Sequence, residues 1–145
     1  MYDLPDINGT IPTTLFELLS LEFIYIYDTG IGGSIPTEIG NLDAVSRLYL
    51  NDNSLTGSIP TEIGNLRSLK ALRLDDNELM GPIPKEFGDL IELEILDMHR
   101  NYLTSLPWEI GWCKALSKKI AMYIYICLLE KLNCEEEKWN KMGCL

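Results

Sequence analysis

The sequence is poor in positive charge. Its 145 residues contain 12 Lys+Arg against 22 Asp+Glu, which gives a formal net charge of −10. Binding to nucleic acid or to an anionic membrane surface needs clustered positive charge, so neither partner is expected. The uncharged run 120–129 has 10 residues, whereas a transmembrane helix needs about 20. Membrane insertion by this chain is therefore not expected.

The sequence also lacks the patterns of most metal and catalytic sites. It has one histidine, His99, and four cysteines without a C-x-x-C pair, so no metal site is expected. Asp97 and His99 lie two residues apart and have the geometry for a His–Asp pair, but no Ser or Cys completes it in a recognisable motif. Phosphate-binding glycine loops and a kinase catalytic signature are absent. We therefore expect no enzyme and no cofactor.

What the sequence does contain is a repeat. Valine occurs once against 24 Leu and 16 Ile, an imbalance that suggests a position-specific pattern. The segment Gly9-Thr10-Ile11-Pro12 returns in similar form at 33–36, 57–60 and 81–84, each time after 24 residues, and a fifth copy at 104–107 arrives one residue early. Such a period indicates a solenoid of stacked units.

Other positions of the unit align with the same period. Leu48, Leu72 and Leu96 align with Ile24, and three asparagines, Asn53, Asn77 and Asn101, align with Thr29. The resulting pattern, L-x-x-L-x-L-x-x-N-x-L-x-G-x-I-P-x-x-I-G-x-L, resembles the plant-type leucine-rich repeat of receptor-like kinase ectodomains and secreted proteins. It covers about three quarters of the chain, from residue 7 to 116.

The resemblance implies an α/β repeat fold, a right-handed leucine-rich-repeat solenoid. A short parallel sheet would form the concave face, with turns and short helical pieces on the convex face. The residues give the same physical picture, because apolar Leu72 and Leu74 flank outward Arg73 with the period of a strand. The three asparagines would form a structural ladder that satisfies buried backbone groups, and Thr29 would leave the first turn less well satisfied.

The repeat divides the chain into segments. We predict a partial first repeat at 1–20, four repeats at 21–44, 45–68, 69–92 and 93–116, and a non-repeat C-terminal tail or cap at 117–145. In the tail, residues 120–129 are consistent with either a strand or a capping helix. The first repeat lacks its strand, so the strand at 23–27 would have an open edge at which the chain could associate with itself.

Cellular location is left open by the sequence. Family resemblance favours an extracellular protein or receptor ectodomain, while no signal peptide opens this chain, which favours a cytoplasmic one. Asn8 begins a glycosylation sequon, which matters only on the secretory route. The cysteines have two interpretations, a pair of disulfides in a C-terminal cap or reduced thiols. They are Cys113, Cys127, Cys134 and Cys144.

The outward strand positions are candidates for binding, because solenoids usually bind through this face. They form columns with an aromatic half and an acidic half. The candidate binding residues are Phe23, Tyr25, Tyr27, Tyr49, Asn51, Arg73, Asp75, Asp97 and His99. A further column holds Asp28, Asp52, Asp76 and Arg100. Its aspartates are more readily explained by solubility than by calcium, since one carboxylate per strand rarely surrounds the ion.

These features support three functional hypotheses. The first is a non-catalytic module that binds a protein, peptide or glycan through the concave strand face. The second is a fragment of a receptor-like kinase ectodomain that acts in signalling. The third is an intracellular scaffold with reduced cysteines.

Overall fold

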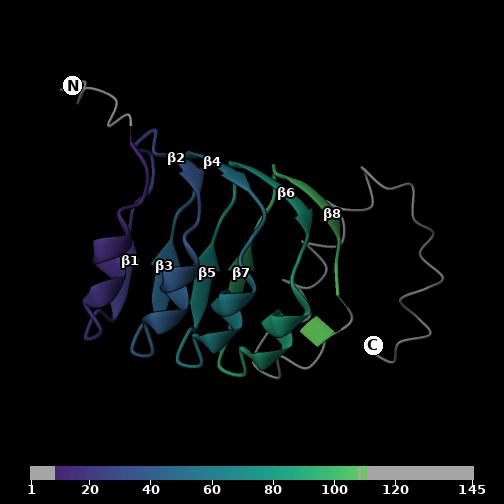
Figure 1. The fold of residues 1–145 in the computed structure, drawn as a ribbon. Coiled ribbons are helices and arrows are strands. Elements are labelled where there is room, and N and C mark those ends of the chain that lie inside the picture. Colours follow the sequence, from purple (N-terminus) through teal and green to yellow (C-terminus); the bar gives the residue numbers. More distant parts are fainter. Residues whose placement is uncertain (1–8, 108, 111–145) are drawn as a thin grey trace.

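Two parallel sheets run along a stack of coils. The computed structural model describes residues 9–107 and 109–110. In Figure 1 the first sheet has the strand order β1-β3-β5-β7, formed by Phe23–Tyr25, Arg47–Tyr49, Ala71–Arg73 and Ile95–Asp97. Its register places Ile24 beside Leu48, Leu48 beside Leu72, and Leu72 beside Leu96. The 24-residue period of the sequence is therefore the period of the stack, and the predicted leucine-rich-repeat solenoid is confirmed.

The second sheet was not expected. It has the order β2-β4-β6-β8, formed by Gly32–Ser34, Ser54–Gly57, Glu78–Pro82 and Tyr102–Ser105. The prediction placed turns and short helical pieces on the convex face and did not include this second sheet. Each of these strands buries at most one side chain fully, so the sequence shows no clear alternation of buried and exposed residues there. The strands form because stacking brings successive backbones into hydrogen-bonding distance.

Short 3-10 helices form the third side of each coil. They are η1 (Thr13–Glu17), η2 (Thr37–Asn41), η3 (Thr61–Asn65) and η4 (Lys85–Asp89). A proline precedes each helix with φ between −60° and −72°, the range its ring imposes. Each helix buries one large apolar side chain, which is Phe16, Ile39, Ile63 or Phe87. The recurring I-P-x-x-I-G segment thus directs one turn of helix onto the core.

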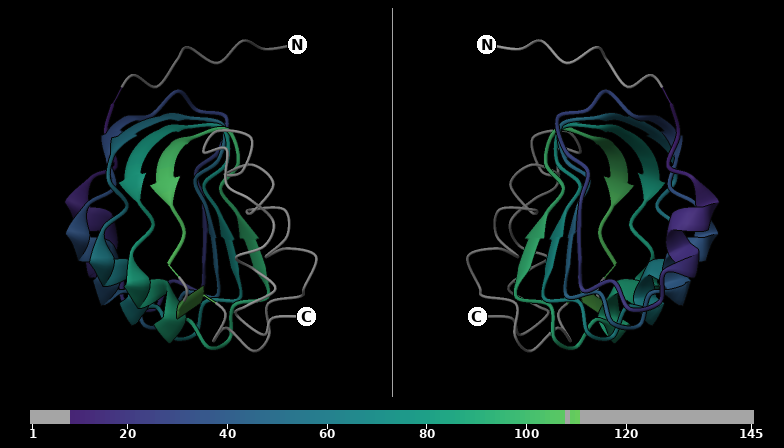
Figure 2. Two further views of the ribbon diagram at one scale, coloured as in Figure 1. Left: turned by 90° about the vertical axis from the view of Figure 1, so that its right-hand side faces the viewer. Right: turned by 90° about the vertical axis from the view of Figure 1, so that its left-hand side faces the viewer.

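The core lies between these three sides and is continuous from coil to coil. Figure 2 looks along the stack and shows the two sheets and the helices arranged around a common interior. Leu48, Leu72 and Leu96 are only 1%, 0% and 3% exposed. One coil cannot remove its apolar side chains from water alone, so burial is a property of the stack.

The asparagine ladder links the coils from inside. Asn77 accepts a hydrogen bond from the Leu55 N–H (2.9 Å) and donates Nδ2 to the carbonyls of Leu50 (2.8 Å), Leu74 (3.1 Å) and Asp75 (3.2 Å). Asn101 repeats this pattern toward the preceding coil. Each asparagine therefore satisfies backbone groups of two successive coils.

The first turn differs because threonine replaces asparagine. Thr29 donates both its N–H (3.2 Å) and its Oγ1 (2.8 Å) to Asn53 Oδ1. Asn53 in turn donates Nδ2 to the Ile26 carbonyl at 2.7 Å. Thr29 is thus held by the second coil and, unlike the asparagines, offers no amide donor to carbonyls of its own turn.

Some predictions fall outside this description. Asn8, the four cysteines and the tail 117–145 lie outside the described residues. Within the described residues, β1 pairs with a strand on one side only, toward β3, so self-association at its other edge stays a prediction. The described helices are all too short and too polar to cross a bilayer.

Candidate binding surface

The outer side of the first sheet carries the side chains predicted to bind a partner. We call this side the strand face. Along each strand the middle residue is buried, and on β1 the residues on either side of it are exposed, with Phe23 and Tyr25 each 48% exposed. A single exposed aromatic side chain is common on protein surfaces. Neighbouring aromatic side chains on a sheet offer a larger contact area to a partner, and they lose little conformational entropy when the partner binds.

Five of these side chains pack against one another across three strands. The Tyr25 and Tyr49 rings lie 4.9 Å apart between centroids, and Phe23 stacks beside Tyr25 at 6.3 Å. Arg47 lies over the Phe23 ring at 5.2 Å and Arg73 over the Tyr49 ring at 5.3 Å. Both distances fall within the range of cation–π attraction. We call these five residues the aromatic–arginine patch.

Arg47 was missing from the predicted binding residues. It lies on β3 opposite Phe23 and therefore belongs to the same exposed column. The sequence offered the signal, because Arg47 is 24 residues after Phe23 and two before Tyr49. The prediction followed only the columns that begin at Tyr25, Tyr27 and Asp28.

The patch carries positive charge on an acidic protein. Within the described part of the chain, the ion pairs involve His99 and Arg100 but neither Arg47 nor Arg73. A side-chain hydrogen bond with Tyr25 raises the pKa of Arg47 further above its ordinary value. Both guanidinium groups are therefore charged and exposed, and within the described residues neither forms an ion pair, although the charge of Arg73 acts on the nearby Asp75. They lie beside aromatic rings that attract apolar groups.

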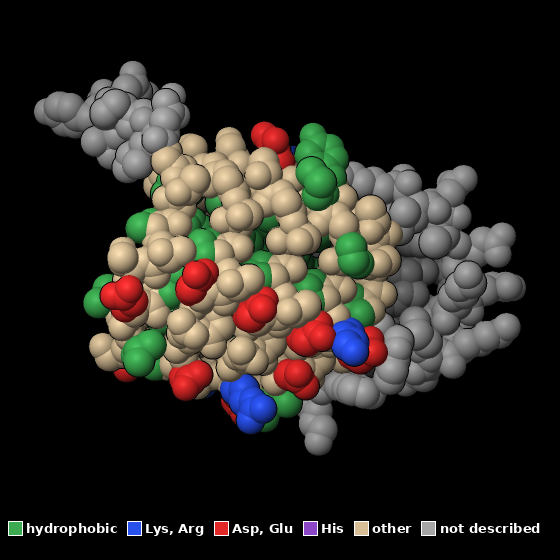
Figure 3. Space-filling view, viewed as in Figure 1, with side chains coloured by type: hydrophobic (Ala, Val, Ile, Leu, Met, Phe, Trp, Pro, Cys, Tyr) green, Lys and Arg blue, Asp and Glu red, His purple; other side chains and the backbone are tan. Residues whose placement is uncertain are grey.

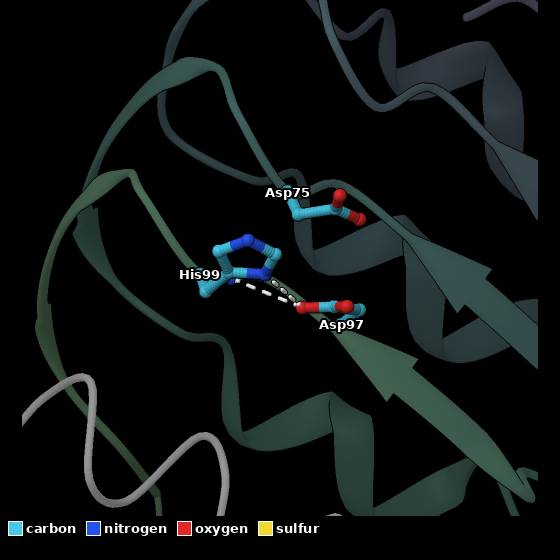
Figure 4. Close-up of side chains that lie close together, drawn as sticks. All are labelled: Asp75, Asp97 and His99. Carbon is cyan, nitrogen blue, oxygen red and sulfur yellow. Dashed lines mark hydrogen bonds and ion pairs between the residues drawn. The ribbon is translucent and has the colours of Figure 1, made fainter.

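At the other end of the strand face, three ionisable side chains converge. Figure 4 shows Asp97, which ends β7, and His99, which follows this strand, beside Asp75, which follows β5. His99 Nδ1 lies 2.6 Å from Asp97 Oδ1, and one ligand atom from each of the three residues lies within 4.8 Å of the others. We call Asp75, Asp97 and His99 the Asp–His cluster.

Burial and charge shift two pKa values in this cluster. Burial raises the pKa of the Asp75 carboxyl, and the negative charge of Asp97 raises it further. Burial alone would lower the pKa of His99, but the hydrogen bond and charge of Asp97, with the charges of Asp75 and Asp76, outweigh it and raise that pKa. The cluster as a whole thus favours an added positive charge.

The structure places the predicted residues in different environments. Phe23, Tyr25, Tyr49 and Arg73 join in the patch, and Asp75, Asp97 and His99 join in the cluster. Tyr27 is 52% exposed, whereas Asn51 and Asp75 are only 9% and 7% exposed. The expectation that these last two side chains point outward is wrong, because the chain turns inward directly after each strand. Their binding role stays a prediction, and for Asn51 its burial argues against it.

The aspartate column has a conformational explanation. Asp28, Asp52, Asp76 and Arg100 have φ of 55°, 53°, 51° and 49°. This left-handed conformation is unfavourable for most residues, and aspartate and asparagine tolerate it best after glycine. Among the described residues, Asp28, Asp52 and Asp76 are not part of any group placed to hold a metal ion.

The opposite side of the molecule is acidic and has no such patch. Figure 3 shows the side that carries the 3-10 helices, where acidic side chains are spread across the surface. They include Glu38, Glu62 and Glu86, each in the first turn of a helix. Basic side chains also lie on this side (Figure 3), and η4 begins with Lys85, but they are set among the acidic ones.

Comparison with known proteins agrees with this geometry. The fold defines a leucine-rich-repeat solenoid with an exposed strand face. The family model described as Leucine Rich Repeat matches residues 20–42, 44–66, 68–90 and 92–113, and the chain belongs to this family. None of the curated proteins matches the chain.

Solved structures of plant receptors are similar over most of the chain. One is the leucine-rich-repeat ectodomain of the Arabidopsis thaliana membrane receptor kinase GASSHO1/SCHENGEN3 in complex with CASPARIAN STRIP INTEGRITY FACTOR 2, at 35% identity and a TM-score of 0.74. It covers 76% of this chain and 13% of that chain. Another is the Arabidopsis receptor kinase HAESA with the peptide hormone IDA and the co-receptor SERK1, at 35% identity, a TM-score of 0.71 and coverage of 74% and 18%.

A bacterial protein is similar as well. The leucine-rich-repeat protein LIC12759 of Leptospira interrogans has 33% identity and a TM-score of 0.70, covering 86% of this chain and 33% of that chain. The chain thus spans less than a fifth of the two plant structures and about a third of the bacterial one. The repeat architecture is shared by proteins of distant organisms, so a function must be argued from this chain's own surface.

Proposed function

We propose that this chain is a non-catalytic binding module that recognises an extended peptide or protein segment across the strand face. The observation that carries the proposal is the aromatic–arginine patch. Its five side chains pack against one another, and Phe23 and Tyr25 are each 48% exposed. Aromatic and arginine side chains dominate the energetics of protein interfaces when they are buried by a partner.

The chemistry of the patch specifies the ligand class. Arg47 and Arg73 are fixed over rings and lack carboxylate partners among the described residues. A guanidinium donates two parallel hydrogen bonds to a carboxylate, so an acidic group of the ligand fits here. The rings of Phe23, Tyr25 and Tyr49 offer contact to an apolar side chain of the same ligand. The ligand we expect therefore combines acidic and apolar groups.

The receptor structures support a role of this kind. HAESA is bound to a peptide hormone and a co-receptor, and GASSHO1/SCHENGEN3 to CASPARIAN STRIP INTEGRITY FACTOR 2. We extend this by proposal to the present chain, as part of a receptor-like ectodomain that acts in signalling outside the cell. The competing proposal, an intracellular scaffold, requires the same strand face but reduced cysteines. Intact-mass measurement on native material separates them, because disulfides or a glycan on Asn8 would contradict the scaffold.

A displayed random-peptide library tests the proposal directly. We expect selection on the full chain to enrich peptides that carry Asp, Glu or a free carboxylate next to apolar residues. The triple variant Tyr25→Ala, Tyr49→Ala, Arg73→Ala should weaken binding of the enriched peptides by about 100-fold or more, since hot-spot truncations each cost about 2 kcal/mol or more. Glu38→Ala, Glu62→Ala on the opposite side is the matched control and should bind like the wild type.

Two results would contradict the proposal. Equal binding by the triple variant and the wild type would remove the strand face as the site. Enrichment of basic peptides would remove the assigned ligand chemistry. A third result is that a glycan array, and not the peptide library, yields ligands that bind the wild type but not the triple variant. The strand face would then remain the site, and its ligand would be a glycan instead of a peptide.

The open edge of β1 favours a second, weaker interaction. In the described part of the chain this strand is paired only with β3, and unpaired edges tend to add another strand. We propose weak self-association of the chain there. Light scattering that shows only monomer at high concentration would refute it.

A further inference from the structure

The Asp–His cluster adjoins the aromatic–arginine patch, because Arg73 lies beside Asp97 in the register of β5 and β7, and it has the side chains of a metal site. From its geometry we propose that Asp75, Asp97 and His99 bind a divalent transition-metal ion of the zinc type. The inference is independent of the proposed function, because it uses none of the five patch residues.

The three side chains are already close to the required positions. One ligand atom from each lies within 4.8 Å of the others (Figure 4). Zinc bonds to nitrogen and oxygen of about 2.0–2.2 Å place two ligand atoms about 3–3.5 Å apart. His99 Nδ1 and Asp97 Oδ1, at 2.6 Å, would therefore have to separate by less than about 1 Å. Both side chains are partly exposed, at 26% and 33%, so this shift is available to them.

Asp75 provides a second observation that points to a cation. The residue is 7% exposed, and its Oδ1 is buried without a hydrogen-bond partner in the described part of the protein. An unsatisfied buried carboxylate oxygen is costly, because it has lost water and gained nothing in exchange. A metal ion between Asp75 and its neighbours would supply the missing positive partner.

The coil before it shows that the arrangement is not a general feature of the repeat. Asn51 occupies the position of Asp75 one repeat earlier, and its Oδ1 is also buried without a partner. The residues that correspond to Asp97 and His99 in that coil are Arg73 and Asp75. A guanidinium group has no lone pair to offer a metal ion, so an arginine at this position cannot serve as a ligand. The full set of ligands therefore occurs once in the described coils.

His99 also has a partner that would orient it for coordination. Its Nε2 lies 3.4 Å from Asp76 Oδ2, and Asp76 is held in turn by Arg100 through a contact of 3.1 Å. A metal-binding histidine usually donates its other N–H to a carboxylate, which fixes the tautomer. With the proton on Nε2 facing Asp76, Nδ1 is the nitrogen that faces Asp97 and can bind the metal.

The donor set selects the class of metal. One imidazole nitrogen and two carboxylate oxygens suit zinc and its first-row neighbours, whereas calcium and magnesium prefer oxygen ligands only. Three protein ligands leave a coordination position open for water or for a group of a partner. We therefore expect zinc to bind and calcium and magnesium to bind much more weakly.

The single histidine makes the test specific. Zinc chloride is added to the full chain in mildly alkaline buffer, and the ring signals of His99 are followed by NMR. We expect these signals to shift and saturate with zinc, and to stay in place with calcium or magnesium at the same concentration. No shift with zinc, or an equal shift with calcium, would overturn the proposal.

Variants link the signal to the cluster. Asp75→Asn places in this coil the residue found at position 51, so we expect it to fold, which circular dichroism verifies. It should weaken zinc binding by about tenfold or more, as should Asp97→Asn. Asp28→Asn is the control, because Asp28 is not part of the cluster, and it should leave the affinity unchanged. If both cluster variants bound zinc like the wild type, the three-residue site would be wrong.

Discussion

At the scale of single residues, backbone conformation explains the aspartates that follow the first-sheet strands. Asp28, Asp52 and Asp76 have φ between 51° and 55°, a region that costs most L-residues about 1–2 kcal/mol. The conserved spacing of this column within the chain thus reflects the turn, not a ligand. Arg100 occupies the same conformation without the short polar side chain that eases it.

Two substitutions at one position test this explanation. Asp52→Gly and Asp52→Ala both remove the carboxylate that accepts a hydrogen bond from Asn51 Nδ2 at 2.6 Å. The difference between their free energies of unfolding therefore reports the cost of the backbone conformation. We expect the glycine variant to be more stable than the alanine variant by about 1 kcal/mol. Urea unfolding measures both. If the alanine variant were the more stable of the two, as alanine is relative to glycine in a helix, residue 52 would not have the left-handed conformation.

The asparagine ladder gives the second prediction at this scale. Asn77 is buried and makes four hydrogen bonds to backbone groups of two coils. Asn77→Ala should lower the free energy of unfolding by about 1–3 kcal/mol, because it leaves those groups unsatisfied. Asn65→Ala, at an exposed asparagine of η3, is the control and should change stability by less than about 0.5 kcal/mol. Equal stability of Asn77→Ala and the wild type would show that water replaces the amide.

At the scale of elements, the 3-10 helices stack closely because a glycine faces the next helix. A Cβ on Gly64 would lie 2.6 Å from the Glu86 carbonyl oxygen and 2.7 Å from its Cβ. Gly40 and Gly88 meet Glu62 and Glu109 in the same way. The glycine in the I-G pair therefore sets the spacing of the helical side.

Gly64→Ala tests this spacing. The added methyl group meets backbone that cannot move independently, so we expect the free energy of unfolding to fall by about 1–3 kcal/mol. Gly9→Ala is the control, because a Cβ there would have no atom of the described residues within 4 Å, and it should be close to the wild type. Thermal unfolding compares the two variants. A Gly64→Ala variant as stable as Gly9→Ala would mean that the helices can separate at little cost.

The sequence predicted the elements unevenly, and the reason is physical. The first sheet was predictable because Leu72 and Leu74 alternate with outward Arg73, and the helical side because Pro and Gly recur around one apolar residue. The second sheet was not, since a segment such as Ser54–Gly57 buries only Leu55 fully. Its strands depend on pairing between coils, which a pattern within one coil does not contain.

The same limit applies to the candidate sites. Columns 24 residues apart predicted that Tyr25, Tyr49 and Arg73 share a face, because register follows from the period. The residues of the Asp–His cluster were predicted only in pairs. Asp75 and His99 are 24 residues apart and share a column, and Asp97 can pair with His99, but the sequence did not show that all three side chains converge. The chain turns inward after each strand and thereby buries Asp75. An alternation of apolar and polar residues within the strand does not predict this turn.

At the scale of the whole molecule, stability should depend on position in the stack. Leu72 is fully buried and lies in register between Leu48 and Leu96, whereas Ile24 has, among the described residues, only Leu48 beside it in the sheet. In a one-dimensional array each unit is stabilised by its neighbours, so a central unit has two stabilising interfaces and a terminal unit one.

Truncation at the two positions should therefore differ in cost. We expect Leu72→Ala to lower the free energy of unfolding by about 2–5 kcal/mol, and Ile24→Ala to fall at or below the lower end of that range because its surroundings can collapse or fray. Leu19→Ala, at a side chain 60% exposed, is the control. Urea unfolding should show the order Leu19, Ile24, Leu72 in increasing loss. An equal loss at Ile24 and Leu72 would mean that the coils unfold as one indivisible core, without the neighbour-by-neighbour coupling that the register implies.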